Sequence, residues 1–216
     1  ELTEALRSLQ GDDKVRAVVL TGNGAAFSAG GDFEAIQALW KASPIESRRH
    51  LLDGLEVIKA LYHLERPTVA LVNGPAVGGG LSLALACDFV LAAEDAALSF
   101  PFVRLGIIPD MGALYLVPRL VGMRRALELF LSGRTFTGKE AADMGLDIEA
   151  AGRTDDSAIS WLSGPYRDVL RARLLKLSTK LTSLGKGGKM GMPTVKKLAG
   201  DNDVADKRLC QANRLL

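Results

Sequence analysis

The sequence predicts an α/β fold with mainly parallel strands. Short apolar runs alternate with segments of helical periodicity along residues 1–150, which is typical of parallel sheets whose strands are joined by helices. The run Val15–Leu20 barely alternates between apolar and polar residues, as expected of a strand buried on both faces. Two of the apolar runs lead into adjacent glycines and then into a helical pattern, so a strand–turn–helix succession occurs twice.

The expected elements follow the breaks in the chain. Apolar residues share one face of the first helix, which Gly11 ends, and prolines at Pro44 and Pro67 mark later boundaries. Thr137 and Glu140 match a capping box, which predicts the start of a short helix. We expect helices over residues 2–10, 33–41, 45–64, from 81 onward, 114–120, 124–131 and 137–145, strands over 15–20, 68–72, 87–93 and 146–150, and an extended piece over 98–103.

The stretch Val72–Asp88, VNGPAVGGGLSLALACD, is the centre of this pattern. Three glycines lie between a strand and a run of good helix formers. Glycines let the backbone approach a ligand closely, and the first amides of a helix have no partner within it. Such a turn suits an anion, or an oxygen that becomes one during a reaction. Tight packing of a helix on a sheet is an alternative explanation of the same glycines.

The composition is that of a globular protein with one sizeable core. The chain has 216 residues, of which 48% are hydrophobic, and its net charge is +2. This small net charge does not predict a nucleic-acid partner, and no run is apolar and long enough to predict a membrane span. We expect a cytoplasmic protein whose two cysteines, Cys87 and Cys210, are reduced. The basic residues beyond Gly152 are interpreted as a solvated helix face and an oligomer contact.

Five segments together resemble the crotonase family, the enoyl-CoA hydratase/isomerase superfamily. They occur in the family's order and cover most of the chain from Val15 to Ala150. They read AFSAGGDF (26–33), NGPAVGGGLSLALACDFVLAAEDA (73–96), RLGIIPDMGA (104–113), LVPRLVG (116–122) and SGRTFTGKEAADMGL (132–146).

The resemblance implies a crotonase-like spiral of ββα repeats over residues 1–150, apparently without the family's N-terminal strand hairpin. It implies a C-terminal helical region over 151–216 for trimerisation and site closure, and a homotrimer or dimer of trimers. The implied substrate is an acyl-CoA thioester, so CoA enters as part of the substrate. No separate cofactor and no metal site are expected.

The resemblance also places two backbone N–H donors, an oxyanion hole for the thioester oxygen, at Gly31 and Gly79. Both precede helical patterns in this sequence, and losing one such donor typically costs about 3–4 kcal/mol. We further expect Ala29, Phe33 and Phe102 to contact the substrate. Ala25 stands where many relatives have a Lys or Arg near the CoA phosphates, so those contacts must come from elsewhere.

The family's hydratases use two glutamates, and the corresponding positions here are Ser82 and Phe102. Asp110 stands where several family isomerases carry an acid. A single carboxylate suffices to shuttle a proton between the α and γ carbons of a β,γ-enoyl thioester. We expect apolar neighbours, among them Phe102 and Leu105, to raise the pKa of Asp110 by desolvation. The alternative role of Asp110 is a helix N-cap.

The leading hypothesis is therefore an enoyl-CoA isomerase with Asp110 as its catalytic residue. Alternatives are an isomerase of an aromatic-ring-derived acyl-CoA, a hydratase-like protein of unknown reaction, and a non-catalytic crotonase-fold binding protein. Asp32 is interpreted as the cap of the helix that begins at Phe33, and His50 and His63 as ordinary helix residues.

Overall fold

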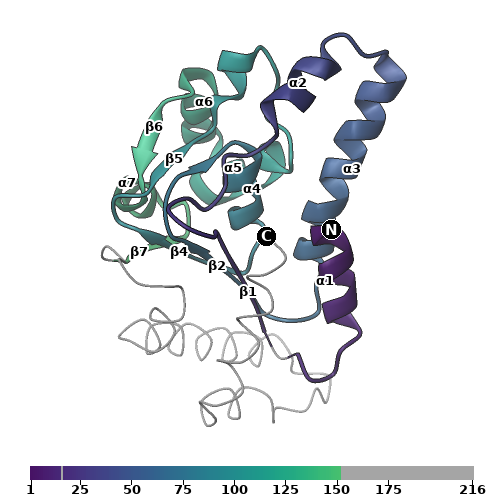
Figure 1. Cartoon of the computed structure of the whole chain (residues 1–216). Coiled ribbons are helices and arrows are strands. Elements are labelled where there is room, and N and C mark those ends of the chain that lie inside the picture. Colours follow the sequence, from purple (N-terminus) through teal and green to yellow (C-terminus); the bar gives the residue numbers. More distant parts are fainter. Residues whose placement is uncertain (16, 152–216) are drawn as a thin grey trace, which may run out of the picture. The chain divides into compact units, whose positions relative to one another are not determined.

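The computed structural model describes residues 1–15 and 17–151 (Figure 1). The predicted C-terminal helical region, apart from Ala151, lies outside the described residues. Helices and strands alternate along the described chain, which confirms the α/β class. The elements are α1 (Leu2–Gln10), β1 (Val18–Thr21), α2 (Phe33–Leu39), α3 (Pro44–Tyr62), β2 (Thr68–Val72), β3 (Ala76–Val77), α4 (Gly79–Leu85), β4 (Phe89–Ala93), β5 (Ala97–Ser99), the 3₁₀ helix η1 (Pro101–Leu105), α5 (Ala113–Val121), α6 (Met123–Ser132), β6 (Thr135–Thr137), α7 (Gly138–Met144) and β7 (Ile148–Ala151).

A parallel four-stranded sheet, in the order β1-β2-β4-β7, forms the centre of the described region. Val18 lies opposite Thr68, Val69 opposite Phe89, and Val90 opposite Ile148. Every residue of β2 and of β4 is buried, as their continuous apolar runs predict. A smaller sheet, β3-β5-β6, pairs β3 with β5 in parallel and β5 with β6 antiparallel.

Side-chain caps begin three of the helices. Asp32 Oδ1 accepts a hydrogen bond from Ala35 N–H at 2.8 Å, which confirms its predicted capping of α2. Capping boxes begin α3, at Ser43, and α7, at Thr137, and the second was predicted from the sequence. These bonds satisfy amides that have no partner inside the helix.

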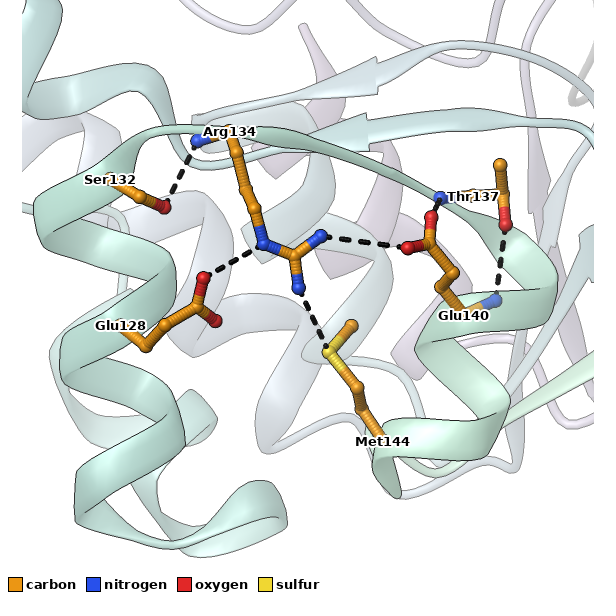
Figure 2. Close-up of polar contacts among 6 residues, drawn as sticks. All are labelled: Glu128, Ser132, Arg134, Thr137, Glu140 and Met144. Carbon is orange, nitrogen blue, oxygen red and sulfur yellow. Dashed lines mark hydrogen bonds and ion pairs between the residues drawn. The ribbon is translucent and has the colours of Figure 1, made fainter.

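Arg134 joins the α7 capping box to α6 (Figure 2). Its Nε donates to Glu128 Oε1 at 2.8 Å, and one terminal nitrogen lies 3.7 Å from Glu140 Oε1. The other carboxylate oxygen of Glu140 accepts from Thr137 N–H at 2.7 Å, while Glu140 N–H donates to Thr137 Oγ1. One guanidinium therefore bridges carboxylates from two helices on either side of β6.

Several predicted boundaries were wrong. The extended piece ends at Ser99, and η1 follows, because Pro101 occupies the first turn of a 3₁₀ helix. The strand predicted from Cys87 begins two residues later, since the Cys87 N–H still bonds to Ala84 O at the end of α4. The strands β3 and β6, with two and three residues, were not predicted.

Candidate functional site

The two glycine turns lie directly against each other. Phe27 and Ser28 N–H both donate to the carbonyl of Pro75, at 3.0 and 3.1 Å. The Ser28 carbonyl in turn accepts from Val77 N–H at 3.0 Å, and Ser28 forms a parallel bridge with Ala76. Segments about 50 residues apart in the sequence are thus joined by backbone hydrogen bonds immediately before Gly30 and Gly78.

Glycine is required where these turns meet. Gly30 has φ +88°, and a Cβ there would lie 2.6 Å from Val77 O and 3.4 Å from the amide nitrogen of Gly79. A Cβ on Gly80 would lie 2.6 Å from the Ser28 Cβ. Close approach of the two chain segments therefore requires glycine at positions 30 and 80. It also brings the predicted donor Gly79 beside the turn that carries Gly31.

The predicted oxyanion donors are the backbone amides of Gly31 and Gly79. Gly79 is the first residue of α4, and the preceding Gly78 has φ +53° and provides no side-chain cap. Within residues 1–15 and 17–151, neither the Gly31 nor the Gly79 N–H donates a hydrogen bond. Their role as two oxyanion donors stays a prediction.

Met111 covers Gly79 and was not singled out from the sequence. A Cβ on Gly79 would lie 3.1 Å from Met111 Cγ, and a Cβ on Gly54 of α3 would lie 2.9 Å from Met111 Sδ. Met111 also has φ +48°, which is rare for a residue other than glycine. Such strain persists only where the surroundings hold it, and it is frequent at functional sites. The Pro109–Gly112 turn was the available signal in the sequence.

Asp110 immediately precedes Met111 and is half-buried. Burial raises its pKa, while its own backbone amide and the charge of His50 oppose that rise. The net effect is a raised pKa, as expected from the sequence. The capping alternative is wrong, because Gly112 is the N-cap of α5 and receives no help from a side chain. Asp110 contributes only its carbonyl, which accepts from Ala113 N–H at 2.8 Å.

The other predicted residues differ in exposure. Phe102 is buried, and its ring lies 3.8 Å from the Cβ position of Gly78, next to the predicted donor. Ser82 is fully buried, and its hydroxyl donates to Gly78 O at 3.1 Å, which explains this serine without a catalytic role. Phe33 and Ala29 are both exposed. The roles of Phe102, Phe33 and Ala29 in substrate binding stay predictions.

Metal-ligand clusters and membrane-spanning helices are both absent from the described part of the chain. It contains no cluster of three or more His, Cys, Asp or Glu side chains that could hold a metal ion. None of its helices combines the length and the apolar character needed to cross a membrane.

Comparison with known proteins identifies the family. Residues 1–162 match the model of the enoyl-CoA hydratase/isomerase family. The 4-chlorobenzoyl coenzyme A dehalogenase-1 of Arthrobacter sp. is 44% identical over 148 residues, which are 68% of this chain and 53% of that protein. The enoyl-CoA isomerase/hydratase fer4 of Mycosarcoma maydis is 43% identical over 144 residues, 64% of this chain and 50% of that protein.

Comparison with solved structures supports the same family. The crystal structure of an enoyl-CoA hydratase from Polaromonas sp. JS666 superposes with a TM-score of 0.70 at 27% identity, covering 98% of this chain and 81% of the other. The crotonase fold predicted from the sequence is therefore confirmed. The chain spans about half the length of the curated relatives it matches. It belongs to the enoyl-CoA hydratase/isomerase family, within the crotonase superfamily.

Proposed function

We propose that this protein is an enoyl-CoA isomerase that moves a double bond of an acyl-CoA from the β,γ to the α,β position. One observation carries the proposal: a single half-buried carboxylate, Asp110, precedes Met111, whose side chain lies on the predicted donor Gly79. The raised pKa of that carboxyl suits a group that must both accept and return a proton.

The reaction needs three groups of this chain. The carboxylate of Asp110 removes a proton from the α carbon, which lies between the thioester carbonyl and the alkene, and the electron pair spreads onto the thioester oxygen and through the alkene to the γ carbon. The amides of Gly31 and Gly79 stabilise the resulting dienolate. Protonated Asp110 then returns the proton to the γ carbon, which leaves the double bond between the α and β carbons, so that the carboxylate is regenerated and no water is consumed.

The surroundings favour isomerisation over hydration. Adding water requires a second group that positions the water molecule. The hydroxyl of Ser82 is occupied by the Gly78 carbonyl, and Phe102 offers only a buried ring. Asp110 is the acid that remains beside the glycine turns among the predicted site residues.

A second candidate is halide displacement from an aromatic acyl-CoA. The observation that favours it is the 44% identity to two Arthrobacter proteins named 4-chlorobenzoyl coenzyme A dehalogenases. An aromatic acyl group would also fit the alternative of a ring-derived acyl-CoA isomerase. Release of chloride from 4-chlorobenzoyl-CoA separates halide displacement from both isomerase hypotheses.

The assembly and location belong to the same proposal. We infer a homotrimer or dimer of trimers that acts on acyl-CoA in the cytoplasm, as expected of this family. Equilibrium sedimentation with and without acyl-CoA measures the assembly. A monomer at all concentrations would contradict that part of the proposal.

The decisive assay follows conversion of a β,γ-enoyl-CoA to its conjugated α,β isomer by absorbance. Asp110→Asn removes the base and is expected to lower kcat by roughly 10²–10⁴-fold. Asp143→Asn, an exposed change on α7, is the matched control. Full activity of Asp110→Asn would refute the assignment of the base. If the wild-type protein neither isomerises the substrate, nor exchanges α-protons of a saturated acyl-CoA, nor releases chloride from 4-chlorobenzoyl-CoA, the results favour the non-catalytic alternative.

A further inference from the structure

Ser28 contacts both glycine turns, through its backbone and through its side chain. Its N–H donates to Pro75 O at 3.1 Å, and its carbonyl accepts from Val77 N–H at 3.0 Å. Its side chain fills the space in which a Cβ on Gly80 would lie, 2.6 Å from both the Cβ and the Oγ of Ser28. Gly80 follows the predicted donor Gly79 in α4. Ser28 is therefore in contact with the chain on either side of the Gly79 amide.

The Ser28 hydroxyl also forms a hydrogen bond within the first turn. Its Oγ accepts from the Gly30 N–H at 3.2 Å, a local bond that serine hydroxyls commonly make in turns. This bond holds the peptide group that enters Gly30, whose φ is +88°. The carbonyl of Gly30 belongs to the peptide group whose N–H is the predicted donor at Gly31. Because glycine adopts positive and negative φ about equally readily, contacts of the surrounding chain have to select the conformation at Gly30.

The chain after Gly31 has an anchor of its own. Asp32 Oδ1 accepts from Ala35 N–H at 2.8 Å, and the Asp32 carbonyl accepts from Ile36 N–H at 3.0 Å, so α2 begins at a fixed point. The Gly31 peptide group thus lies between the bond of Ser28 and the cap of α2. Of these two anchors, Ser28 is the one whose backbone is bonded to the turn that carries the other donor.

We propose that Ser28 is a positioning residue for the oxyanion hole: its hydroxyl sets the orientation of the Gly31 amide, while its backbone fixes that amide relative to Gly79. This inference deepens the proposed function and rests on Gly31 and Gly79 being its two donors. Preorganised donors stabilise a developing oxyanion without having to reorganise during the reaction. Loss of the hydroxyl removes the acceptor of the Gly30 N–H, so that a smaller fraction of molecules presents both donors to the thioester oxygen.

Ser28→Ala tests this role, because it removes the acceptor and keeps the Cβ that packs on Gly80. The expected result is a fall in kcat of about 3- to 10-fold, which corresponds to one neutral hydrogen bond. KM is expected to stay nearly unchanged, because interactions with an oxyanion contribute most in the transition state. Complete loss of a donor would cost more, roughly 10²–10³-fold in kcat.

Ser132→Ala is the matched control. The Oγ of Ser132 accepts from Arg134 N–H at 3.2 Å, again two residues along the chain (Figure 2). This bond has the same type and length as that of Ser28, but it lies at the end of α6. Ser132→Ala is expected to leave kcat unchanged, and urea unfolding measures the stability of both variants. If the two variants lower kcat equally, Ser28 acts through stability and the inference is overturned.

Infrared spectroscopy of a bound thioester separates this inference from the proposed reaction. The probe is butanoyl-CoA labelled with ¹³C at its carbonyl, whose stretching frequency falls as hydrogen bonds to the oxygen strengthen. We expect the shift seen on the wild-type protein to become smaller in Ser28→Ala and to stay the same in Ser132→Ala. An equal shift in Ser28→Ala and the wild type, or no shift in the wild type, would overturn the inference. A shift that depends on Ser28 in a protein without isomerase activity would support the positioning role and refute the proposed reaction.

Discussion

Gly30→Ala is expected to separate the two glycine turns. Gly30 has φ +88°, and a left-handed backbone costs an alanine about 1–2 kcal/mol. The added Cβ would also lie 2.6 Å from the backbone oxygen of Val77, and forcing extra volume into a packed region costs about 1–3 kcal/mol. The lower entropy of the unfolded chain returns about 0.4–1 kcal/mol. The net loss of unfolding free energy is about 2–4 kcal/mol.

Urea unfolding measures that loss directly, and the melting temperature is expected to fall by roughly 4–16 °C for a chain of this size. Isomerase activity should fall too, because relief of the 2.6 Å contact with the Val77 oxygen shifts the backbone two residues before the predicted donor Gly79. Gly31→Ala is the matched control. Its backbone is not left-handed, and its Cβ would meet only the tip of the Ile36 side chain at 3.1 Å. If both variants unfold like the wild type, the close approach of the turns is wrong.

Three further experiments test separate parts of the structure. Because burial raises the pKa of Asp110, the native state holds this proton more tightly than the unfolded chain, so ionisation destabilises the fold as the pH rises. Asp110→Asn should therefore raise the unfolding free energy at pH 7, and urea titrations should show this gain shrinking as the pH is lowered. Burial raises the pKa of Cys87 to about 12. In a Cys210→Ser background, a thiol reagent at pH 8 should therefore label the native protein far more slowly than the unfolded protein. Equal labelling rates would contradict the burial of Cys87. Arg134→Ala should lower the unfolding free energy by about 1 kcal/mol in urea titrations, because the ion pairs of Arg134 are partly exposed. Arg134→Lys should recover part of this loss. A loss above about 3 kcal/mol would show that the ion pairs of Arg134 with Glu128 and Glu140 are stronger than surface pairs.

The features that could be predicted from the sequence depend on short stretches of chain. β2 is a continuous apolar run, and it lies in the centre of the parallel sheet. Thr137 and Glu140 lie three residues apart and form their capping box within one helical turn. Asp32 caps α2 for the same reason. In each case the partner that satisfies a backbone group is close in the sequence, so its identity and spacing are enough.

The features that could not be predicted depend on packing between distant segments. The short strand β3 has only two residues, and it exists because β5 and the Ser28 backbone supply its partners. Gly54 stands 57 positions before Met111 in the sequence, and only the packing of α3 on the loop brings the two residues together. The positive φ of Met111 likewise depends on contacts made by its side chain.

The packing around Met111 shows how the fold favours the geometry of the site over local stability. A glycine in the middle of a helix is less favourable than alanine by about 0.5–1 kcal/mol, yet α3 has Gly54. Alanine there would place its Cβ 2.9 Å from Met111 Sδ and push that side chain toward Gly79. Met111 itself is strained, which costs on the order of 1–3 kcal/mol. Both departures fix the loop between α3 and α4. Met111, the residue after Asp110, thereby contacts both α3 at Gly54 and α4 at Gly79. The placement of the proposed base therefore depends on how α3 packs as much as on the loop that carries it.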